Sequence, residues 1–554
     1  MIRKFGLQAL LLLLCLGMSA AVHAQVSTVG SVSGTVRDPQ GNAIPKAEVT
    51  ITEEATGLSR NATADDSGIY TFPALPPGRY TITAAPQGFK KTVNSGVDLH
   101  VGDKLVLDIN LEVGNVSEVV TVTGEAQQVE TRSGDVSSLV SSTQVRELPL
   151  NGRNYAQLAL MVPGVSPVTQ SGAGGAFKTG GTGLDSGVDM SVNGNGSNQN
   201  MWTVDGVNNM DVGSNRTLLV FPSIDSIQEF RVERNSFSAE YGQAQGAVVN
   251  LVTKGGGNEF HGGIFEFFRN DALNANDFFL NKNGQKKGPL RYNNFGGNLS
   301  GPIYLPRFGE GGPSVWSGKN RAFFFWSEEW RRERRGQVLT GHVPTAAEKV
   351  GDFSGALTGP LPHVPGTCHV VNGATVCTPF PGNRIPTNLL SPAGLALVQL
   401  YPNPNSGNPA ADNPNWASAP LQPVDTRQDN IRGDVNITDK MNVMVRYINE
   451  TWTHGVASGN FWGDSPFPTL SSDWDQPSHS FAVKLTNTLT SSSVNEFQFS
   501  RAGNDIFVNT SAQSQALADK IGALFPTVFP SNRGVVPSVF WGPGGYNDLW
   551  HQAP

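Results

Sequence analysis

Two of the three cysteines, Cys368 and Cys377, are spaced as partners of a disulfide. The pair Asn372-Gly373 between them favours a type I′ turn, which places the cysteines opposite each other as a close, non-hydrogen-bonded pair of a hairpin. That arrangement suits disulfide geometry. Unrelated free thiols and a metal site with the nearby His369 are the alternatives. We expect the disulfide, and with it an oxidising compartment outside the inner membrane.

Residues that could carry catalysis do not form a recognisable set in the sequence. Asp and Glu number 46, but they include no paired carboxylates with supporting pocket residues. We find no serine nucleophile elbow, no histidine cluster, no zinc-ligand spacing and no dinucleotide-binding turn. The sequence therefore predicts a protein that is not an enzyme, with no cofactor and no metal.

Composition favours β-structure and narrows the class of protein. The 554 residues include 63 Gly and 36 Pro, and only 15% are charged, against roughly 25% in average proteins. The net charge of -7 does not fit a nucleic-acid coat, and a coiled coil is excluded as well. After the N-terminus no apolar stretch reaches about 18 residues, which excludes helical membrane spans. Alternating strands of a membrane β-barrel remain compatible with the mean hydropathy of -0.23.

Residues 1–24 have the pattern of a cleaved signal peptide. Arg3 and Lys4 precede an apolar run, and Val22-His23-Ala24 forms a small-residue cleavage site before Gln25. A membrane anchor would need about 20 apolar residues. A lipoprotein attached through Cys15 lacks the small residue expected before a lipidated cysteine. We expect an exported protein.

Residues 25–113 predict a β-sandwich, because short alternating strands and turns recur at the spacing of such folds. The segments SGTVRDPQGNAIPKAEVTI and DDSGIYTFPALPPGRYTITAAPQGF resemble the carboxypeptidase regulatory-like domain. The resemblance implies an immunoglobulin-like or transthyretin-like sandwich of the carbohydrate-binding-like fold, without peptidase activity.

Residues 114–256 begin with an extended, β-branched segment, Glu118-Val119-Val120-Thr121-Val122-Thr123-Gly124. One interpretation is simply a further strand. The segment also resembles the TonB box, which pairs edge to edge with a strand of the periplasmic protein TonB, and this is the interpretation we adopt because a plug-like region follows.

The rest of this region resembles the plug of TonB-dependent receptors. The resemblance lies in VRELPLNGRNYAQLALMVPGV, in the turn at Asp205-Gly206, and in SIDSIQEFRVERNSFSAEYGQAQGAVVNLVTKGG. The usual Gly-Pro after the basic residue is replaced by Asn235-Ser236, which points to the Oar-like, carbohydrate-associated branch. The predicted plug residues are Asp205, Gly206, Arg231, Arg234, Tyr241, Gly242, Asn250, Thr253 and Lys254.

Ordinary structural roles are open for the same plug residues. Asp205-Gly206 is by itself a hairpin turn, and Arg231, Glu233 and Arg234 alternate as a solvated strand face would. Because a plug inside a polar lumen must satisfy its charges there, we expect some of these charges to pair with carboxylates on the inner barrel wall. The glycine-rich stretch 171–187 predicts a plug loop.

Residues 257–554 predict the first part of an outer-membrane β-barrel. Seven segments alternate apolar and polar residues over about the 9 to 11 residues that cross an outer membrane. The predicted strands are 260–269, 291–301, 321–331, 430–438, 441–450, 480–490 and 494–501. Transporters of this type close at about 22 strands, so we expect this sequence to stop before its barrel closes. The predicted fold is thus mainly β: sandwich, α+β plug, and an incomplete transmembrane antiparallel barrel.

Loop lengths predict the orientation of the barrel. Short turns near Asp439 and Ser491 mark the periplasmic side, and the long connections 332–429 and 451–479 mark the extracellular side, where the disulfide hairpin would lie. The turn 302–320 is longer than this rule predicts. The basic run 330–335 sits at the outer rim, as a solvated edge or as a contact for lipopolysaccharide phosphates.

These patterns predict a TonB-dependent receptor or transporter of the outer membrane. The resemblance implies capture of an extracellular ligand, with a saccharide as one candidate, and import driven by TonB and its inner-membrane energising complex. No nucleic acid is expected as a partner. The alternative is a secreted or surface adhesin of β-domains that binds polysaccharide without transport.

Overall fold

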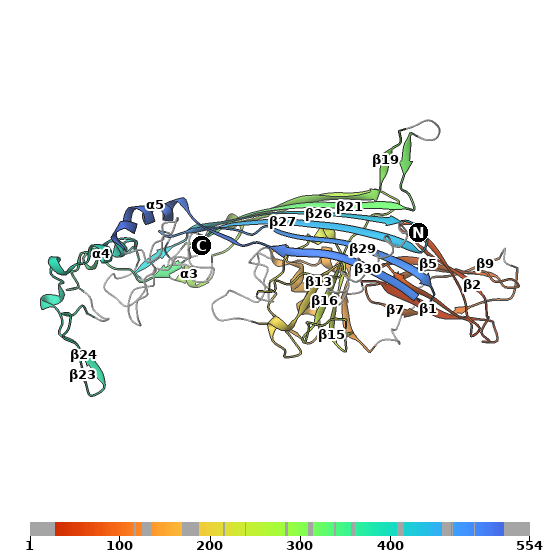
Figure 1. Ribbon diagram of the computed structural model, residues 1–554, viewed down its shortest axis with the longest axis horizontal. Helices are drawn as coiled ribbons and strands as arrows, with labels where there is room; N and C mark the ends of the chain where they lie inside the picture. Colours follow the sequence, from red (N-terminus) through yellow and green to blue (C-terminus); the bar gives the residue numbers. More distant parts are fainter. Residues whose placement is uncertain are drawn as a thin grey trace, which may run out of the picture.

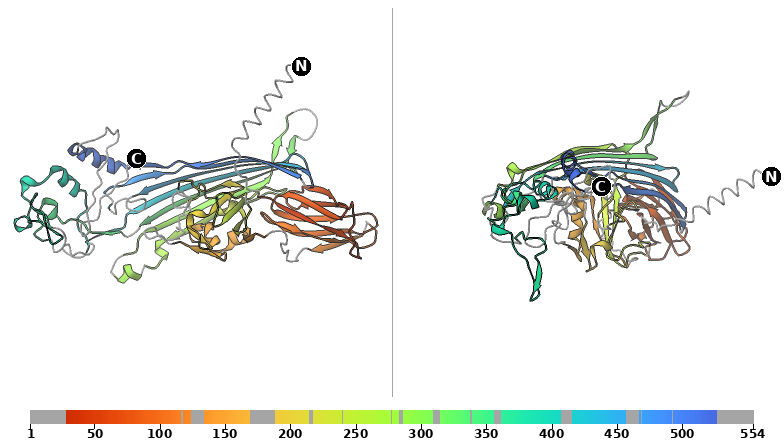
Figure 2. Two further views of the ribbon diagram at one scale, coloured as in Figure 1. Left: turned by 60° about the horizontal axis from the view of Figure 1, so that its bottom comes forward. Right: turned by 60° about the vertical axis from the view of Figure 1, so that its left-hand side comes forward.

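The computed structural model describes residues 28–525, except 116–117, 124–133, 169–187, 214–216, 239, 277, 283–285, 309–313, 337–338, 356–360, 407–414, 457–466, 468 and 492. A long, curved sheet extends over two smaller β-domains that lie beside each other along it (Figures 1 and 2). The predicted signal peptide, Gly124 and the glycine-rich stretch lie outside the described residues.

The N-terminal domain is the predicted sandwich of two sheets. One sheet has the order β4-β1-β7, with β8 also paired to β1, and the other has the order β3-β2-β5-β6-β9. Alternate side chains of both sheets meet in a core that includes Val36, Tyr70 and Ile82, each fully buried. The strands are β1 (Gly30–Arg37), β2 (Glu48–Glu53), β3 (Ser59–Thr63), β4 (Ile69–Leu75), β5 (Gly78–Ala84), β6 (Lys91–Leu99), β7 (Lys104–Val106), β8 (Ile109–Asn110) and β9 (Val119–Thr123).

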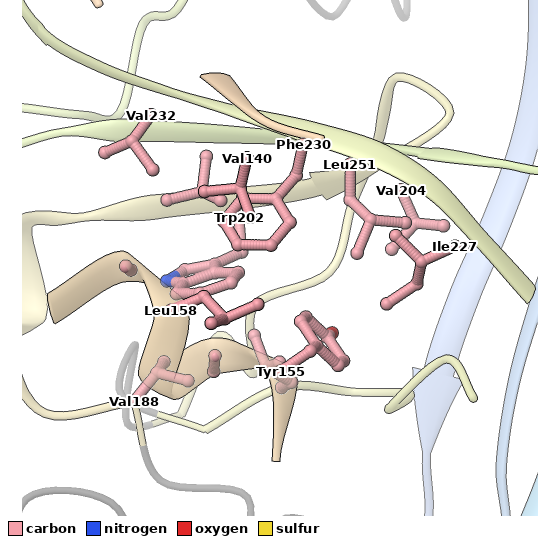
Figure 3. Close-up of a cluster of buried hydrophobic side chains, with 14 of the residues drawn as sticks. Val140, Tyr155, Leu158, Val188, Trp202, Val204, Ile227, Phe230, Val232 and Leu251 are labelled. Atoms are coloured by element: carbon pink, nitrogen blue, oxygen red, sulfur yellow. The ribbon is translucent and has the colours of Figure 1, made fainter. Parts of the chain in front are cut away.

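The second domain corresponds to the predicted plug and is called the plug below. It is a five-stranded mixed sheet of order β10-β15-β16-β13-β14 packed against short helices. Its core surrounds Tyr155, Trp202 and Phe230, and the ring of Tyr155 lies edge to face with the other two (Figure 3). Helix α2 (Ser142–Glu147) begins at a capping box of Ser141 and Gln144. The strands are β10 (Val136–Val140), β11 (Val165–Pro167), β12 (Met190–Val192), β13 (Met201–Val204), β14 (Val207–Asn208), β15 (Ile227–Asn235) and β16 (Val248–Thr253), with 3-10 turns at Asn151–Arg153, Tyr155–Met161, Ser197–Gln199 and Ile224–Ser226.

The long sheet contains all seven predicted barrel strands, and each pairs antiparallel with its neighbours. Side chains alternate in burial, as in β29, whose inward residues are buried and whose outward residues are partly exposed. These strands are β17 (His261–Asn270), β18 (Leu290–Pro302), β21 (Ala322–Gly336), β26 (Leu421–Asn436), β27 (Met441–Val456), β29 (Ser478–Thr490) and β30 (Ser493–Asn504), and the sheet also includes β28 (Ser472–Asp475) and β31 (Phe507–Thr510).

Smaller elements lie in the connections. Three two-stranded hairpins or ribbons pair β19 (Tyr304–Pro306) with β20 (Val315–Ser317), β22 (Leu339–Gly341) with β25 (Trp416–Ser418), and β23 (His369–Val371) with β24 (Ala374–Val376). The helices are α3 (Phe278–Lys282), α4 (Pro392–Val398) and α5 (Ala512–Ile521), with 3-10 turns at Asp271–Leu273, Glu348–Val350, Pro381–Asn383, Thr387–Leu389 and Gly522–Leu524. In the described part of the chain, no helix is both long and apolar enough to cross a membrane.

Several strand boundaries differ from the sequence prediction. Strands β21 and β27 end at Gly336 and Val456, beyond the predicted ends at residues 331 and 450, and two further differences have a structural reason. Strand β26 begins at Leu421 instead of Asn430, because its charged outward residues pair with the neighbouring strand: Asp425 binds Arg332 and Arg334 of β21. Strand β9 belongs to the sandwich sheet, although we placed the end of the sandwich at residue 113. The basic run 330–335 lies within β21, where its arginines meet carboxylates.

Candidate functional site: the β9 edge strand and the plug–wall interface

The segment that resembles a TonB box forms β9, an edge strand of the sandwich. It pairs in parallel with β6, with Lys91 opposite Val119 and Ser95 opposite Thr123. Lys91 N donates to Glu118 O at 2.9 Å, and Lys90 Nζ lies 3.2 Å from the Glu118 carboxylate. Because the second edge of β9 pairs with no strand among the described residues, its backbone groups are open to a further strand.

Few side-chain contacts hold β9 in place. Val119 and Val122 are 58% and 48% exposed, and neither they nor Val120 belong to the hydrophobic core of the sandwich. Its attachment therefore rests on a short parallel ladder and an exposed ion pair, which contributes little to stability. The strand can leave the sheet without opening the core.

Asp205 lies at the contact between plug and barrel wall. Asp205 and Gly206 both have positive φ, 49° and 83°, in the turn between β13 and β14. The buried Asp205 carboxylate accepts hydrogen bonds from Thr253 N at 2.9 Å and Thr253 Oγ1 at 2.8 Å. Two wall arginines approach the same carboxylate, with Arg432 Nη1 at 3.5 Å and Arg446 Nη1 at 3.4 Å. We call these four residues the Asp205 clamp.

The two arginines of the clamp are fixed from the barrel side. Arg432 of β26 forms two hydrogen bonds with Asp434, each 2.9 Å, and donates to Thr253 O at 2.6 Å. Arg446 of β27 is fully buried and donates to Ser480 Oγ at 2.7 Å. Buried charges of this kind are costly without partners, so the clamp favours a docked plug.

A second set of contacts joins the other side of the plug to the wall. Ser223 Oγ donates to Glu329 at 2.5 Å, and Phe221 N donates to Glu450 at 2.8 Å. Arg153 binds Asp225 at 2.7 Å and lies over the rings of the wall residues Phe265 and Phe267. A cavity of about 20 Å³ lies among these residues, with Arg153, Glu329 and Glu450 in its lining, and has room for a single water molecule.

The charges of β15 do not meet the wall in the way we predicted. Arg231 binds Asp103 of the sandwich. Arg234 donates to the Pro163 carbonyl and to Ser138 Oγ within the plug. For these contacts the prediction that carboxylates of the barrel wall are the partners is wrong. Strand β15 faces the sandwich and the plug's own turns, whereas the plug contacts the wall through its loops at residues 153, 205 and 221–223.

The sandwich and the plug are joined through the turn that follows β6. His100 Nδ1 lies 2.8 Å from Glu229 Oε2, and Val101 N donates to Glu229 Oε1 at 2.7 Å. The hydrogen bond with Glu229 raises the pKa of His100 above its usual value. Together with the Asp103–Arg231 pair, these contacts hold the sandwich against plug strand β15.

The predicted motif around Tyr241 and Asn250 forms a buried polar network inside the plug. Asn250 Nδ2 donates to Glu233 at 2.8 Å, and Tyr241 Oη donates to the same carboxylate at 3.2 Å. Thr203 Oγ1 donates to Asn250 Oδ1 at 2.7 Å. Burial raises the pKa of Glu233. This network joins three strands of the plug sheet and has a structural role.

Two other predicted plug residues have different surroundings. Lys254 Nζ donates to the Asp225 carbonyl at 2.7 Å, and burial lowers the pKa of this lysine. Gly242 has open space where a Cβ would lie, so its conformation gives no steric reason for glycine.

Cys368 and Cys377 form a disulfide across the hairpin of β23 and β24, in which Val371 faces Ala374. Asn372 and Gly373 both have positive φ, 51° and 81°, as a type I′ turn requires. His363 lies close to the two sulfurs. Because both sulfurs are bonded to each other, only the imidazole remains as a metal ligand, too few for a site.

Several residues of the interface were missed in the sequence. Arg432, Arg446, Glu329 and Glu450 lie on the inward face of barrel strands. The signal that could have identified them is a charged residue at an inward position of an alternating strand. His100 and Asp103 lie in a short turn that gave no signal.

Comparisons with known proteins identify the parts of the chain. Residues 252–548 match the outer membrane beta barrel domain, and residues 31–112 match the carboxypeptidase regulatory-like domain. The chain is 27% identical to the TonB-dependent transporter Oar of Myxococcus xanthus over 300 residues, which cover 51% of this chain and 26% of Oar. The chain thus spans about a quarter of the length of that relative.

Solved structures with similarity include a transporter and a receptor. The transporter YddB of Escherichia coli matches with a TM-score of 0.38 and 9% identity, over 66% of this chain and 39% of YddB. The siderophore receptor PirA of Acinetobacter baumannii matches with a TM-score of 0.33 and 14% identity, over 66% of this chain and 40% of PirA. With more than half of its length in the matched barrel domain, this chain belongs to the outer membrane β-barrel family, as an Oar homologue with an N-terminal carboxypeptidase regulatory-like domain.

Proposed function

We propose that this protein is a TonB-dependent receptor that captures an extracellular ligand and imports it through a plugged outer-membrane barrel. The observation that carries the proposal is the plug held against the inner wall by the Asp205 clamp, while β9 lies exposed at the edge of the adjoining sandwich. Binding and passage need no bond to be broken, so we propose no enzymatic activity.

In this proposal TonB pairs with β9 as an added strand and transmits energy from its inner-membrane complex. Backbone hydrogen bonds would give the affinity, and the side chains of Glu118 to Gly124 would set the register. Since residues 124–133 connect β9 to plug strand β10, a pull on β9 would reach β15 and then the clamp. Residues 1–24 would direct export as a signal peptide.

The extracellular side would meet the ligand first. The disulfide hairpin and the loops around β22 and β25 belong to the long connection that we assign to that side. A saccharide is the ligand class that the Oar-like branch suggests. At the outer rim, Arg332 and Arg334 are exposed enough to contact lipopolysaccharide phosphates, although each already binds Asp425.

The test combines membrane fractionation of cells carrying the complete gene with a pull-down by the C-terminal domain of TonB. Because Lys91 N donates to Glu118 O, the parallel ladder directs the N–H of Val120 toward β6 and the N–H of Thr121 toward the open edge. Proline removes the N–H donor at either position. We expect Thr121→Pro to abolish binding of TonB at the open edge of β9. Val120→Pro tests whether TonB must also replace β6 as the partner of β9.

Asn61→Pro is the matched control, because β3 is the opposite edge strand of the same sheet. Outer-membrane recovery with binding lost only in the β9 variants supports the proposal. A soluble or loosely surface-bound protein that captures TonB equally well in every variant, or not at all, would instead favour the polysaccharide-binding adhesin.

A further inference from the structure

The hairpin of β19 and β20, which we call the rim hairpin, projects from the periplasmic end of the barrel sheet. It connects β18 to β21 and extends away from the plug and the sandwich, on the outer side of the sheet (Figures 1 and 2). Its base is fixed by hydrogen bonds from Ile303 N to Ala322 O and from Gly318 N to Ile303 O, 2.9 and 2.8 Å long. It is therefore a defined extension of the wall.

Every residue of both strands in the rim hairpin is exposed, including its large apolar side chains. Phe308 is 91% exposed, and the others are Tyr304, Leu305, Val315 and Trp316. A two-stranded hairpin with strands this short is marginal in water. So much apolar surface on both faces indicates that something beyond the described residues covers it.

The rim hairpin continues the outward surface of the barrel. Tyr304 stacks on Phe260 with ring centroids 6.0 Å apart, and Phe260 lies 6.3 Å from Phe324. The register places Phe324 in one outward row with Gly433, Val445, Val483 and Phe499. In a protein of the outer membrane β-barrel family this row faces lipid.

The composition of the rim hairpin fits a membrane surface. Tyr and Trp are the side chains enriched at membrane–water interfaces. The segment 303–321 also has three basic residues, Arg307, Lys319 and Arg321, against one acidic residue, Glu310. Basic side chains beside aromatic ones bind anionic headgroups while the rings enter the acyl boundary.

We propose that the rim hairpin is a lipid-binding element that inserts into the periplasmic leaflet of the outer membrane. Its aromatic and aliphatic side chains enter the phospholipid interface beside the first barrel strands, and Arg307 contacts headgroup phosphates. This explains why a periplasmic connection is long where the barrel rule calls for a short turn. The proposal requires only the barrel family and does not depend on TonB.

The test places a fluorescent thiol label at one position at a time in the product of the complete gene, reconstituted in nanodiscs with brominated phospholipid. The positions are Phe308→Cys in the rim hairpin, Phe499→Cys on the lipid-facing row, and Lys440→Cys in the short turn between β26 and β27 on the same side of the membrane. The native cysteines 368 and 377 are bonded to each other and do not react without reductant.

We expect the bromolipid to quench the label at 308 about as strongly as at 499, and far more than at 440. Charge adds a second readout, since Arg307→Glu should reduce the quenching at 308 in nanodiscs with anionic lipid while leaving position 499 unchanged. Quenching at 308 as weak as at 440, with free access for a water-soluble quencher, would overturn the proposal. Protection from both quenchers would overturn it too, because a protein surface would then be the cover.

Discussion

Replacing Asp205 by asparagine should loosen the plug from the barrel wall more than any other single change of charge in the plug loops. The variant keeps the shape of the side chain and an acceptor for Thr253, but it leaves Arg432 and Arg446 facing a neutral amide. The perturbation therefore isolates the charge of one carboxylate.

The size of the effect follows from the two charge pairs. At 3.4 and 3.5 Å, each pair corresponds to about 5 kcal/mol of attraction at an effective dielectric of about 20, before desolvation is subtracted. Removing one partner of a buried pair costs about 3–5 kcal/mol in practice. Arg446 is fully buried, so water cannot replace the lost carboxylate without a structural change.

Hydrogen exchange of the complete protein in nanodiscs measures this loss. Amides of β13 and β16, which flank Asp205, should exchange roughly two to three and a half orders of magnitude faster in Asp205→Asn. Asp66→Asn, an exposed change in the sandwich, is the matched control and should have no effect on these amides.

A double variant checks the mechanism. Arg446→Met removes the buried charge that Asp205→Asn leaves unpaired, so the combined loss should be smaller than the sum of the two single losses by at least about 1 kcal/mol. Additive losses, or an exchange rate in Asp205→Asn within about threefold of wild type, would refute the reasoning that the clamp holds the plug.

Three further predictions concern the other contacts. Because the pKa of His100 is raised in the folded state, protonated His100 should stabilise docking of the sandwich on the plug. This stabilisation should be complete below a pH of about 6.5 and should be lost as the pH rises through the raised pKa. Cross-linking between the two domains should therefore depend on pH, and His100→Gln should abolish that dependence, although Asp98, Asp103, Glu229 and Arg231 also contribute charge. The pKa of buried Glu233 is also raised, so the stability of the plug should fall as the pH rises through that pKa. In urea unfolding of the plug, Glu233→Gln should remove this pH dependence of stability, because the glutamine does not titrate but still offers an acceptor to Asn250. Reduction of the Cys368–Cys377 disulfide should lower the local stability of the β23–β24 hairpin by less than about 3 kcal/mol and make it sensitive to protease. The heat-induced gel shift of the barrel should not change.

The sequence allowed the barrel strands to be predicted because their alternation repeats over ten or more residues. The sequence was less informative at Leu421–Asp429. There the outward side chains of the strand form ion pairs, so the segment has the polar composition of a loop. Asn372-Gly373 specified its turn because both residues accept positive φ, a purely local requirement.

Contacts between domains could not be predicted in the same way. Strand β9 pairs with β6. Whether this segment joins the sandwich sheet or stays unpaired depends on how the chain returns to the sandwich after residue 113. To predict the clamp, one would have to know which inward arginines face the turn at Asp205. The docking of one domain on the other determines this. Alternation shows only that Arg432 and Arg446 point inward.

The Asp205 clamp also bears on which solutes a displaced plug would admit. Asp205 belongs to the plug, whereas Arg432, Arg446 and Lys484 belong to the wall. Withdrawal of the turn between β13 and β14 would leave these cations around the lumen, with Asp434 still bound to Arg432. Low-dielectric walls focus such a field, and rings of basic side chains select anions in pores. Because Glu329 and Glu450 also lie on the inward face, the positive potential would be confined to the region around Arg432, Arg446 and Lys484, where it would attract an anionic group of a passing solute.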